Sequence, residues 1–545
     1  MEGKGRGGYF SRFLYGLGRT FRFYPDSSFA RARSEKPEKA KSYFLLSYRQ
    51  QFQNAMAKMR EQSFFLTRLS AFYRNLFSTR VRSFGLLFFT GGFLQILFYF
   101  LSRTLSFFSA GEENLLFGVC YIFIAVLCAF ARGDVENAVK KSFLFRFVLR
   151  PLFGVEAWRL PTGRKHDSTY PMIFAGIVFA LFSLVFSPGK VLVFLLLTAL
   201  VLFVFSLPEA GLYLIGLLFF LIPSASLTVL IFLTLLSFLC KCAIGKRSIS
   251  LGFTQGLVLL CLALLFFVGK AALVFQLFFL YFLISCLIRT IASLRRLLFC
   301  FVLGALFCAG LLCLDFVLAQ PYAIPLLRGL DLESILVVSA REETGVFLVL
   351  IFPLAAGLFR SMRWGGKMAL FPLLFLVSFA SLSFIGSVQL WNALILALML
   401  FGLFSYRSFL ITLSAFSLSF ITALNLFPAT VGESLLALFG DGGKSQTDTG
   451  LFALFSQQLG PFFWLGLAVV LCLFFSRIYL FKRDTTRVEV YPLVLSSAVS
   501  VIAFLYLGFC PVPVTRQVIL IFVCLLAIPE NAYFCARREE IKLPF

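Results

Sequence analysis

The chain has 545 residues, of which 60% are hydrophobic and only 14% charged, and its mean hydropathy is +0.94. A water-soluble protein of this length cannot bury so many apolar side chains, so the composition excludes a soluble globular fold. A net charge of +24 would suggest nucleic-acid binding in a soluble protein. In a membrane protein the positions of the basic residues predict topology instead, and no nucleic-acid partner is expected.

The first 82 residues form a basic segment with 17 Lys or Arg and five acidic residues, which is half of the net charge. The first long apolar run begins near Phe84, so no signal peptide is expected and the positive-inside rule predicts a cytoplasmic segment. Phe65, Leu69 and Phe72 recur at helical spacing among arginines. This pattern favours an amphipathic helix on an anionic membrane surface, with a solvated basic tail as the alternative.

Residues 83–529 are dominated by apolar runs of bilayer-spanning length, which predict an all-α, polytopic transmembrane helical bundle of about 12–16 spans. Runs such as 191–207 and 226–239 are apolar on every face, whereas the strands of a membrane barrel would alternate in polarity. The candidate spans are 84–102, 114–131, 171–187, 191–207, 209–223, 224–240, 251–269, 272–288, 297–319, 345–359, 368–386, 391–405, 408–427, 459–475, 490–508 and 517–529.

A single alternation of these spans places nearly every basic cluster on the cytoplasmic side. The loop 133–170 and the tail 530–545 are then cytoplasmic, as are both termini. The spans 209–223 and 224–240 meet at Pro223, where we expect two crossings, with one kinked element or a re-entrant pair as the alternative. The clusters are Lys140 with Lys141 and Arg146, Lys241 with Lys246 and Arg247, Arg289 with Arg295 and Arg296, Arg360 with Arg363 and Lys367, Arg407, Lys482 with Arg483, and Arg537 with Arg538.

The same topology leaves two longer segments, 320–344 and 428–450, on the outer face. Both mix basic and acidic residues beside the bilayer. Arginine pairs well with phosphate oxygens and a carboxylate can act as a base, so the pattern predicts an enzyme or carrier for a phosphate-bearing lipid. Ordinary solvated loop residues are the alternative. The candidates are Arg328, Arg341, Lys444 and Arg516 for substrate binding, and Glu342 and Asp448, with Glu343 beside them, as the base.

The sequence contains no nucleotide-binding glycine loop, dinucleotide fingerprint or paired-histidine metal motif. Its one histidine, His166, lies in the predicted cytoplasmic loop, and its 13 cysteines are mostly dispersed through the spans as small apolar residues. We therefore expect no metal and no cofactor. Asp315, close to the outer end of its span, is nearly the only candidate for a buried charge, which argues against an ion-coupled transporter.

Three stretches carry a resemblance to a known family: Glu209-Ala-Gly-Leu-Tyr to Pro223 with the following 227–247, Thr290 to Leu298 with its Leu-Arg-Arg, and Gln458-Leu-Gly-Pro to Arg477. From about Trp158 onward the chain resembles the O-antigen ligase and O-antigen polymerase-like membrane proteins, in a form typical of clostridial-type bacteria. The resemblance implies a multi-pass protein of the bacterial cytoplasmic (inner) membrane. It also implies glycan transfer from a polyprenyl-pyrophosphate donor on the outer face, with external arginines binding the pyrophosphate and an external histidine as base.

The chain departs from this family pattern where the function would lie. Val388 holds the position of a family arginine, and residues 447–450, which align with the family's two histidines, contain none. Valine and threonine neither carry positive charge nor take up a proton near neutral pH, so other residues must replace them if the reaction is kept. The nearest are Arg341, Glu342, Lys444 and Asp448.

Three functions therefore stay open at this level. The first is a divergent glycan transferase whose partners are membrane lipid and a polyprenyl-pyrophosphate-linked glycan. The second is a catalytically degenerate relative that binds the lipid-linked glycan or acts as a scaffold for envelope assembly. The third is a transporter or lipid flippase. The sequence leaves the donor glycan, the acceptor and the oligomeric state open.

Overall fold

The computed structural model describes the helical parts of the chain and short stretches between them. The main described ranges are 80–104, 111–131, 169–219, 221–243, 253–264, 271–318, 341–361, 387–404, 461–485, 488–510 and 516–542. These residues form fourteen α-helices and one short 3-10 helix, which confirms the predicted all-α bundle. Nine of the described helices are long and apolar enough to cross a membrane, and five further apolar helices are shorter.

Several sequence predictions lie outside the described residues. These are nearly all of the basic segment 1–82, most of the loop 133–170 and of the external segment 320–344, and the whole of 428–450. The expected span 408–427 is also outside, as is most of 368–386.

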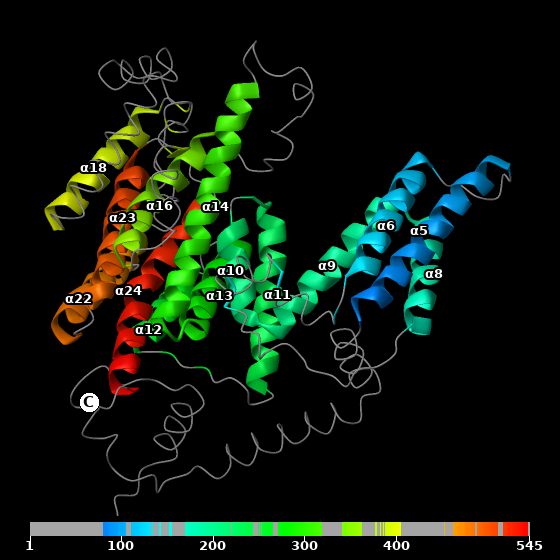
Figure 1. Ribbon diagram of the computed structural model, residues 1–545. Helices are drawn as coiled ribbons and strands as arrows, with labels where there is room; N and C mark the ends of the chain where they lie inside the picture. The colour runs from blue at the N-terminus through cyan, green and yellow to red at the C-terminus, as the bar shows by residue number, and fades with distance from the viewer. Residues whose placement is uncertain are drawn as a thin grey trace, which may run out of the picture. The chain divides into compact units, whose positions relative to one another are not determined.

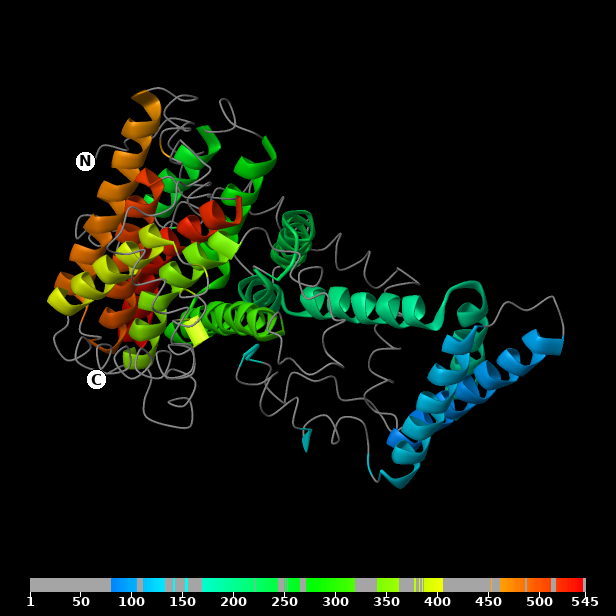
Figure 2. The ribbon, with the colours of Figure 1, turned by 90° about the horizontal axis from the view of Figure 1, so that it is seen from above.

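The structure separates into two compact units, which are described one at a time. The N-terminal unit contains α5 (Val81–Thr104), α6 (Glu112–Phe130), α8 (Thr169–Val185) and α9 (Pro188–Ser206). Helix α5 packs against both α6 and α8, as Figures 1 and 2 show.

Glycines let the backbones of this unit approach closely. A Cβ atom on Gly92 of α5 would lie 2.7 Å from the carbonyl oxygen of Gly118 on α6, and a Cβ on Gly176 of α8 would lie 2.7 Å from the carbonyl oxygen of Leu87. Small residues at crossing points are the usual device where lipid removes the hydrophobic drive for helix association.

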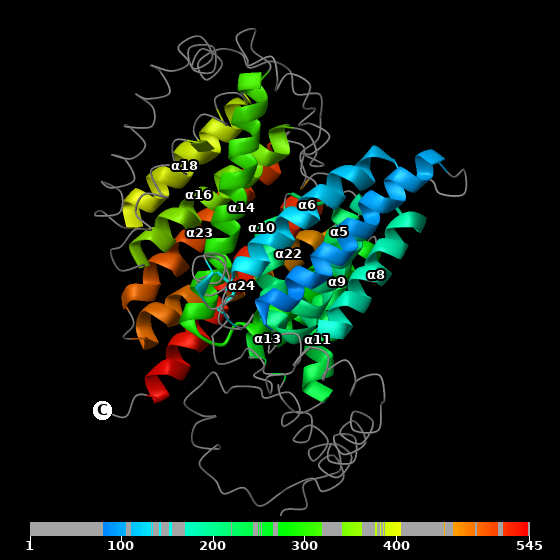
Figure 3. The ribbon, with the colours of Figure 1, turned by 45° about the vertical axis from the view of Figure 1, so that its right-hand side comes forward.

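The larger unit contains ten further α-helices and the 3-10 helix. They are α10 (Pro208–Leu218), α11 (Ser224–Ala243), α12 (Phe253–Leu264), α13 (Ala271–Leu287), α14 (Ile291–Leu318), α16 (Arg341–Ser361), α18 (Val388–Phe404), α22 (Pro461–Asp484), η6 (Val488–Val490), α23 (Tyr491–Phe509) and α24 (Arg516–Lys542). The apolar stretches of helices α16, α23 and α24 are largely buried by their neighbours, so these helices form the core of this unit. Figures 1 and 3 show α16 and α23 side by side, with α18 next to them.

Helices α16 and α23 pack in antiparallel directions. The Ser500 hydroxyl of α23 donates a hydrogen bond to the Leu350 carbonyl oxygen of α16 at 2.7 Å. Seven residues later on α16, a Cβ on Gly357 would lie 2.6 Å from the carbonyl oxygen of Pro492, near the start of α23. The first turn of α16 therefore lies at the end of the unit where α23 finishes.

The break at Pro223 takes a different form from the expected pair of crossings. Helix α10 has only 11 residues, about 16 Å, which is roughly half of the hydrocarbon thickness of a bilayer. It ends at Leu218, a turn follows, and α11 begins at Ser224. Because nearly all of α10 is buried inside the unit, it is a core helix too short to span a membrane alone.

The C-terminal helix also differs from the expected boundary between a span at 517–529 and a tail at 530–545. Helix α24 continues through Pro529 to Lys542. Residues beyond the proline, including Glu530 and Asn531, are buried and hydrogen-bonded. Packing therefore keeps the helix intact past a residue that removes one backbone donor.

Candidate functional site

Two of the predicted phosphate-binding arginines begin helices at the same end of the larger unit. Arg341 is the first residue of α16 and Arg516 the first residue of α24. Since α16 runs antiparallel to α23, and α23 is joined to α24 by a short connection, both first turns lie where α23 ends. We call this the arginine end.

The arginine end has the electrostatic character that an anion needs. Backbone N–H groups in the first turn of a helix carry partial positive charge, and the two arginines add full charges. Glu342 lies in the first turn of α16, beside Glu343, whose side chain is buried with 6% of its surface exposed. Two positive helix starts and a pair of carboxylates thus share one end of the unit.

The remaining predicted site residues are not placed by the structure. Arg328, Lys444 and Asp448 lie outside the described residues, and for Arg341, Glu342 and Arg516 the described part is the helical backbone. The structure therefore brings three of the six predicted residues to one end of the larger unit.

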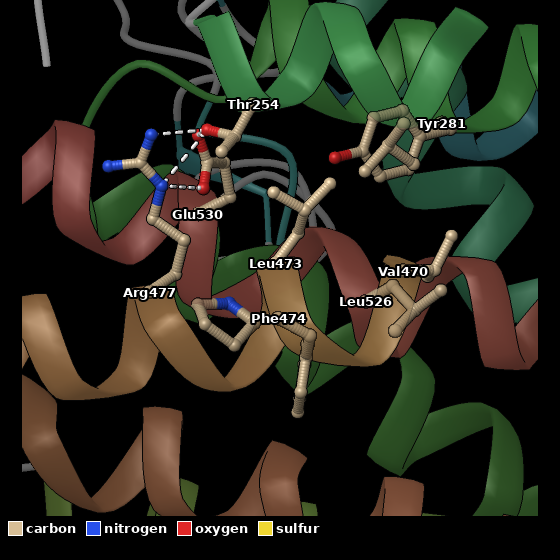
Figure 4. A pocket seen from close by; sticks show the side chains of 10 residues that line it. Thr254, Tyr281, Val470, Leu473, Phe474, Arg477, Leu526 and Glu530 are labelled. Carbon is tan, nitrogen blue, oxygen red and sulfur yellow. Dashed lines mark hydrogen bonds and ion pairs between the residues drawn. The ribbon is translucent and has the colours of Figure 1, made fainter. Parts of the chain in front are cut away.

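A second polar cluster, which the sequence analysis missed, lies inside the same unit. Arg477 of α22 and Glu530 of α24 form an ion pair, with 2.7 Å between Nε and Oε2 and only 3% and 5% of their side chains exposed. Arg477 Nε also donates to the hydroxyl oxygen of Thr254 on α12 at 2.9 Å, and that hydroxyl donates to Glu530 Oε1. Figure 4 shows the three side chains facing one another. We call these residues the buried triad.

The surroundings of the buried triad tie the same three helices together. The guanidinium of Arg477 lies 5.3 Å from the ring centre of Tyr533, within cation–π distance. Gln255 follows Thr254 on α12, and Asn531 follows Glu530 on α24. The amide nitrogen Nε2 of Gln255 donates a hydrogen bond to Oδ1 of Asn531 at 3.3 Å. Charge inside a membrane is tolerated when it is paired in this way.

The cavity beside the buried triad is small. It offers about 10 Å³ to the centre of a water molecule and is lined by the triad together with apolar residues and Tyr281. This is room for about one water. A sugar or a lipid headgroup does not fit there, so the triad in this conformation joins helices and does not hold an organic substrate. Among the described residues, no group of three metal-ligating side chains could bind an ion.

The sequence missed the triad because the predicted spans stopped too early. The expected span 459–475 ends two residues before Arg477, and 517–529 ends one residue before Glu530. The structure extends these helices to Asp484 and Lys542. A signal was present, since apolar residues continue on both sides of each charge. Arg477 and Glu530 are therefore buried charges in addition to the expected candidate Asp315, whose side chain lies outside the described residues.

The basic residues predicted to be cytoplasmic gather at the opposite end of the larger unit. Arg295 of α14 lies 3.8 Å from Glu489 before α23, and Arg537 Nη1 donates to the Tyr533 hydroxyl at 2.7 Å. That hydroxyl in turn donates to Asp484 at the end of α22 at 3.2 Å. We call this the basic end.

Comparisons of the chain with protein-family models, curated proteins and solved structures found no match.

Proposed function

We propose that this multi-pass membrane protein binds a polyprenyl-pyrophosphate-linked glycan at the arginine end and transfers the glycan to an acceptor. The observation that carries the proposal is that Arg341 and Arg516 each begin a helix at the same end of the larger unit. Binding a pyrophosphate requires several positive groups close together. We propose glycan transfer as the reaction because the sequence resembles the O-antigen ligase-like proteins.

The chemistry requires a base and a stabilised leaving group. Glu342 or Asp448 would remove the proton from an acceptor hydroxyl as its oxygen attacks the anomeric carbon. The bond from that carbon to the pyrophosphate oxygen then breaks, and the negative charge develops on the departing pyrophosphate. Arg341 and Arg516, with Arg328 and Lys444 from the flanking segments, would stabilise that charge.

The proposal includes an orientation. With the arginine end on the outer face of a bacterial inner membrane, the basic end would be cytoplasmic, and the positive-inside rule predicts the same side for both termini from their own basic residues. The gathering of Arg295, Arg537 and their neighbours at one end of the larger unit supports this assignment.

A non-catalytic relative is the second candidate function. It is favoured by Val388 and by the missing histidines at 447–450, because the family's charged and proton-accepting groups are absent there. Such a protein would bind the lipid-linked glycan or act as an assembly scaffold.

Mass spectrometry of polyprenyl-pyrophosphate-linked glycans in the native host, with and without this gene, tests the proposal. Deletion should cause one lipid-linked glycan to accumulate. The wild type and the control Arg483→Ala, at the basic end, should reverse the accumulation. Arg341→Ala and Arg516→Ala should not, and neither should one of the two base variants, Glu342→Gln or Asp448→Asn, at equal protein levels. An unchanged lipid pool on deletion contradicts glycan transfer, and full rescue by Arg341→Ala contradicts the assigned site.

A further inference from the structure

A groove runs between α5 and α6 of the N-terminal unit. Its floor is made of small buried residues, Ser83 and Gly85 of α5 and Ala125 of α6. Exposed apolar side chains form its walls, namely Leu86, Phe89 and Val126, together with Ala129. Its volume of about 520 Å³ lies in the range of small-molecule binding sites.

The small residues of the floor create the groove. A Cβ on Gly85 would lie only 3.2 Å from the carbonyl oxygen of Ala125, so the two helices touch through their backbones along this line. Larger neighbours such as Phe89 stand at the sides. The hollow is therefore a consequence of close helix packing, as at other small-residue crossings in membranes.

One end of the groove is cationic and the other is apolar. Arg80 and Arg82 line it where α5 begins, and both are exposed. Phe89 lies seven residues further along α5 than Arg82, which is about 10 Å of helix rise. Because α5 is apolar enough to span a membrane, its first turn lies at the bilayer interface and Phe89 lies among the lipid chains.

We infer that this groove binds one anionic phospholipid. The phosphate group would lie between Arg80 and Arg82, and an acyl chain would follow the apolar walls past Leu86 and Phe89. Only an amphiphile matches both ends, because a soluble anion leaves the apolar walls exposed and a neutral lipid leaves the arginines without a phosphate. Among the described residues, neither arginine forms an ion pair. The site is independent of the arginine end and of glycan transfer.

The test uses the full-length protein in nanodiscs of phosphatidylglycerol or phosphatidylcholine, followed by native mass spectrometry of the lipid that the protein retains. We expect phosphatidylglycerol to be retained preferentially. Each near-surface arginine contributes roughly a fivefold gain in affinity for an anionic lipid, so Arg80→Gln with Arg82→Gln should lower retention by about 25-fold. The control Arg103→Gln removes a charge from the other end of α5 and should leave retention unchanged.

A second pair of variants tests the apolar part of the groove at constant charge. Ala129→Trp fills the space and should abolish selective retention, whereas Phe123→Trp places the same ring on α6 outside the groove and should not. Equal retention of the two lipids, or full retention by Ala129→Trp, overturns the inference.

A photo-crosslinker identifies the occupant directly. With p-benzoylphenylalanine in place of Phe89, illumination should add the mass of one phosphatidylglycerol to the peptide that contains this position. A crosslink to a peptide from residues 1–79 would show instead that the protein's own basic segment fills the groove, and would overturn lipid binding. Thermal unfolding of each variant shows that it is folded before its lipid content is compared.

Discussion

Arg477 and Glu530 show how strongly the stability of a membrane protein can depend on one buried ion pair. Their side chains are almost wholly buried and share Thr254 as a hydrogen-bond partner. Removing one member leaves the other charge buried without compensation, which typically costs about 3–5 kcal/mol, whereas removing both costs less.

The first prediction concerns this pair. Arg477→Met and Glu530→Met should each lower the free energy of unfolding by about 3 kcal/mol or more, and the double variant should lose less than the sum of the two. Unfolding in mixed micelles, followed by circular dichroism, measures all three. The control is Arg483→Gln, which breaks an exposed pair with Asp484 and should change little. Additive losses in the double variant would contradict the ion-pair interpretation.

The second prediction uses two glycines in different surroundings. A Cβ on Gly357 of α16 would lie 2.6 Å from the carbonyl oxygen of Pro492 and would also meet Ser496, whereas a Cβ on Gly466 of α22 meets nothing within 4 Å. Gly357→Ala should therefore destabilise the protein by about 1–3 kcal/mol through overpacking. Gly466→Ala should be neutral or stabilising, because alanine favours the helix. Equal melting temperatures for the two variants would show that α16 and α23 do not approach closely.

At the scale of elements, α10 and the turn after it show how a short helix is held inside the bundle. Its 11 residues are nearly all buried, and the turn ends against α24, where Gln517 Nε2 donates to the Ile222 carbonyl oxygen at 3.0 Å. This side chain supplies a bond that the turn cannot make within its own backbone.

The third prediction follows from that bond. Gln517→Leu should destabilise the larger unit by about 1 kcal/mol, which is the usual size of an interhelical hydrogen bond in a membrane protein. The matched control is Gln389→Leu on α18, because the Gln389 amide oxygen accepts its hydrogen bond from the hydroxyl of Ser387, two residues away and just before the start of the same helix. Thermal unfolding of both variants in one detergent makes the comparison. A larger loss for Gln389→Leu would refute the role of Gln517.

At the scale of the whole molecule, the larger unit has two ends of different character. One carries the first turns of α16 and α24, and also that of α18, because Leu390 of α18 lies against Gly345 of α16. The other carries the ion pair of Arg295 with Glu489 and the hydrogen bond from Arg537 to Tyr533. In a protein that crosses the bilayer these ends face different compartments.

The fourth prediction tests this division. In a cysteine-free background, single cysteines at Thr290 and Thr485 should react with an impermeant thiol reagent from the same side of sealed vesicles. A cysteine at Ser387, before α18, should react only from the opposite side. Under the positive-inside rule the first two are cytoplasmic. Labelling of Ser387 and Thr290 from one side would contradict the arrangement of the larger unit.

The sequence by itself determined the class of fold. Long apolar runs leave backbone polar groups no partner except within a helix, so an all-α bundle follows from composition, and most span centres follow from hydropathy. The sequence also placed Arg341 and Arg516 as candidates on one face, because alternate spans reverse direction. These predictions require only the order of apolar and charged residues along the chain and the fact that the surrounding solvent is lipid.

Only the tertiary structure decided which polar groups meet and where the helices end. Thr254, Arg477 and Glu530 are far apart in the chain, and no spacing rule pairs them. The spans predicted from hydropathy end just before Arg477 and Glu530, because an unpaired charge in lipid is costly. Its cost falls once a partner from another helix neutralises it. The groove between α5 and α6 was equally hidden, since it arises where Gly85 lies against Ala125 across two helices. The buried triad and the groove both depend on which helices pack against each other, and the order of residues along the chain does not reveal that packing.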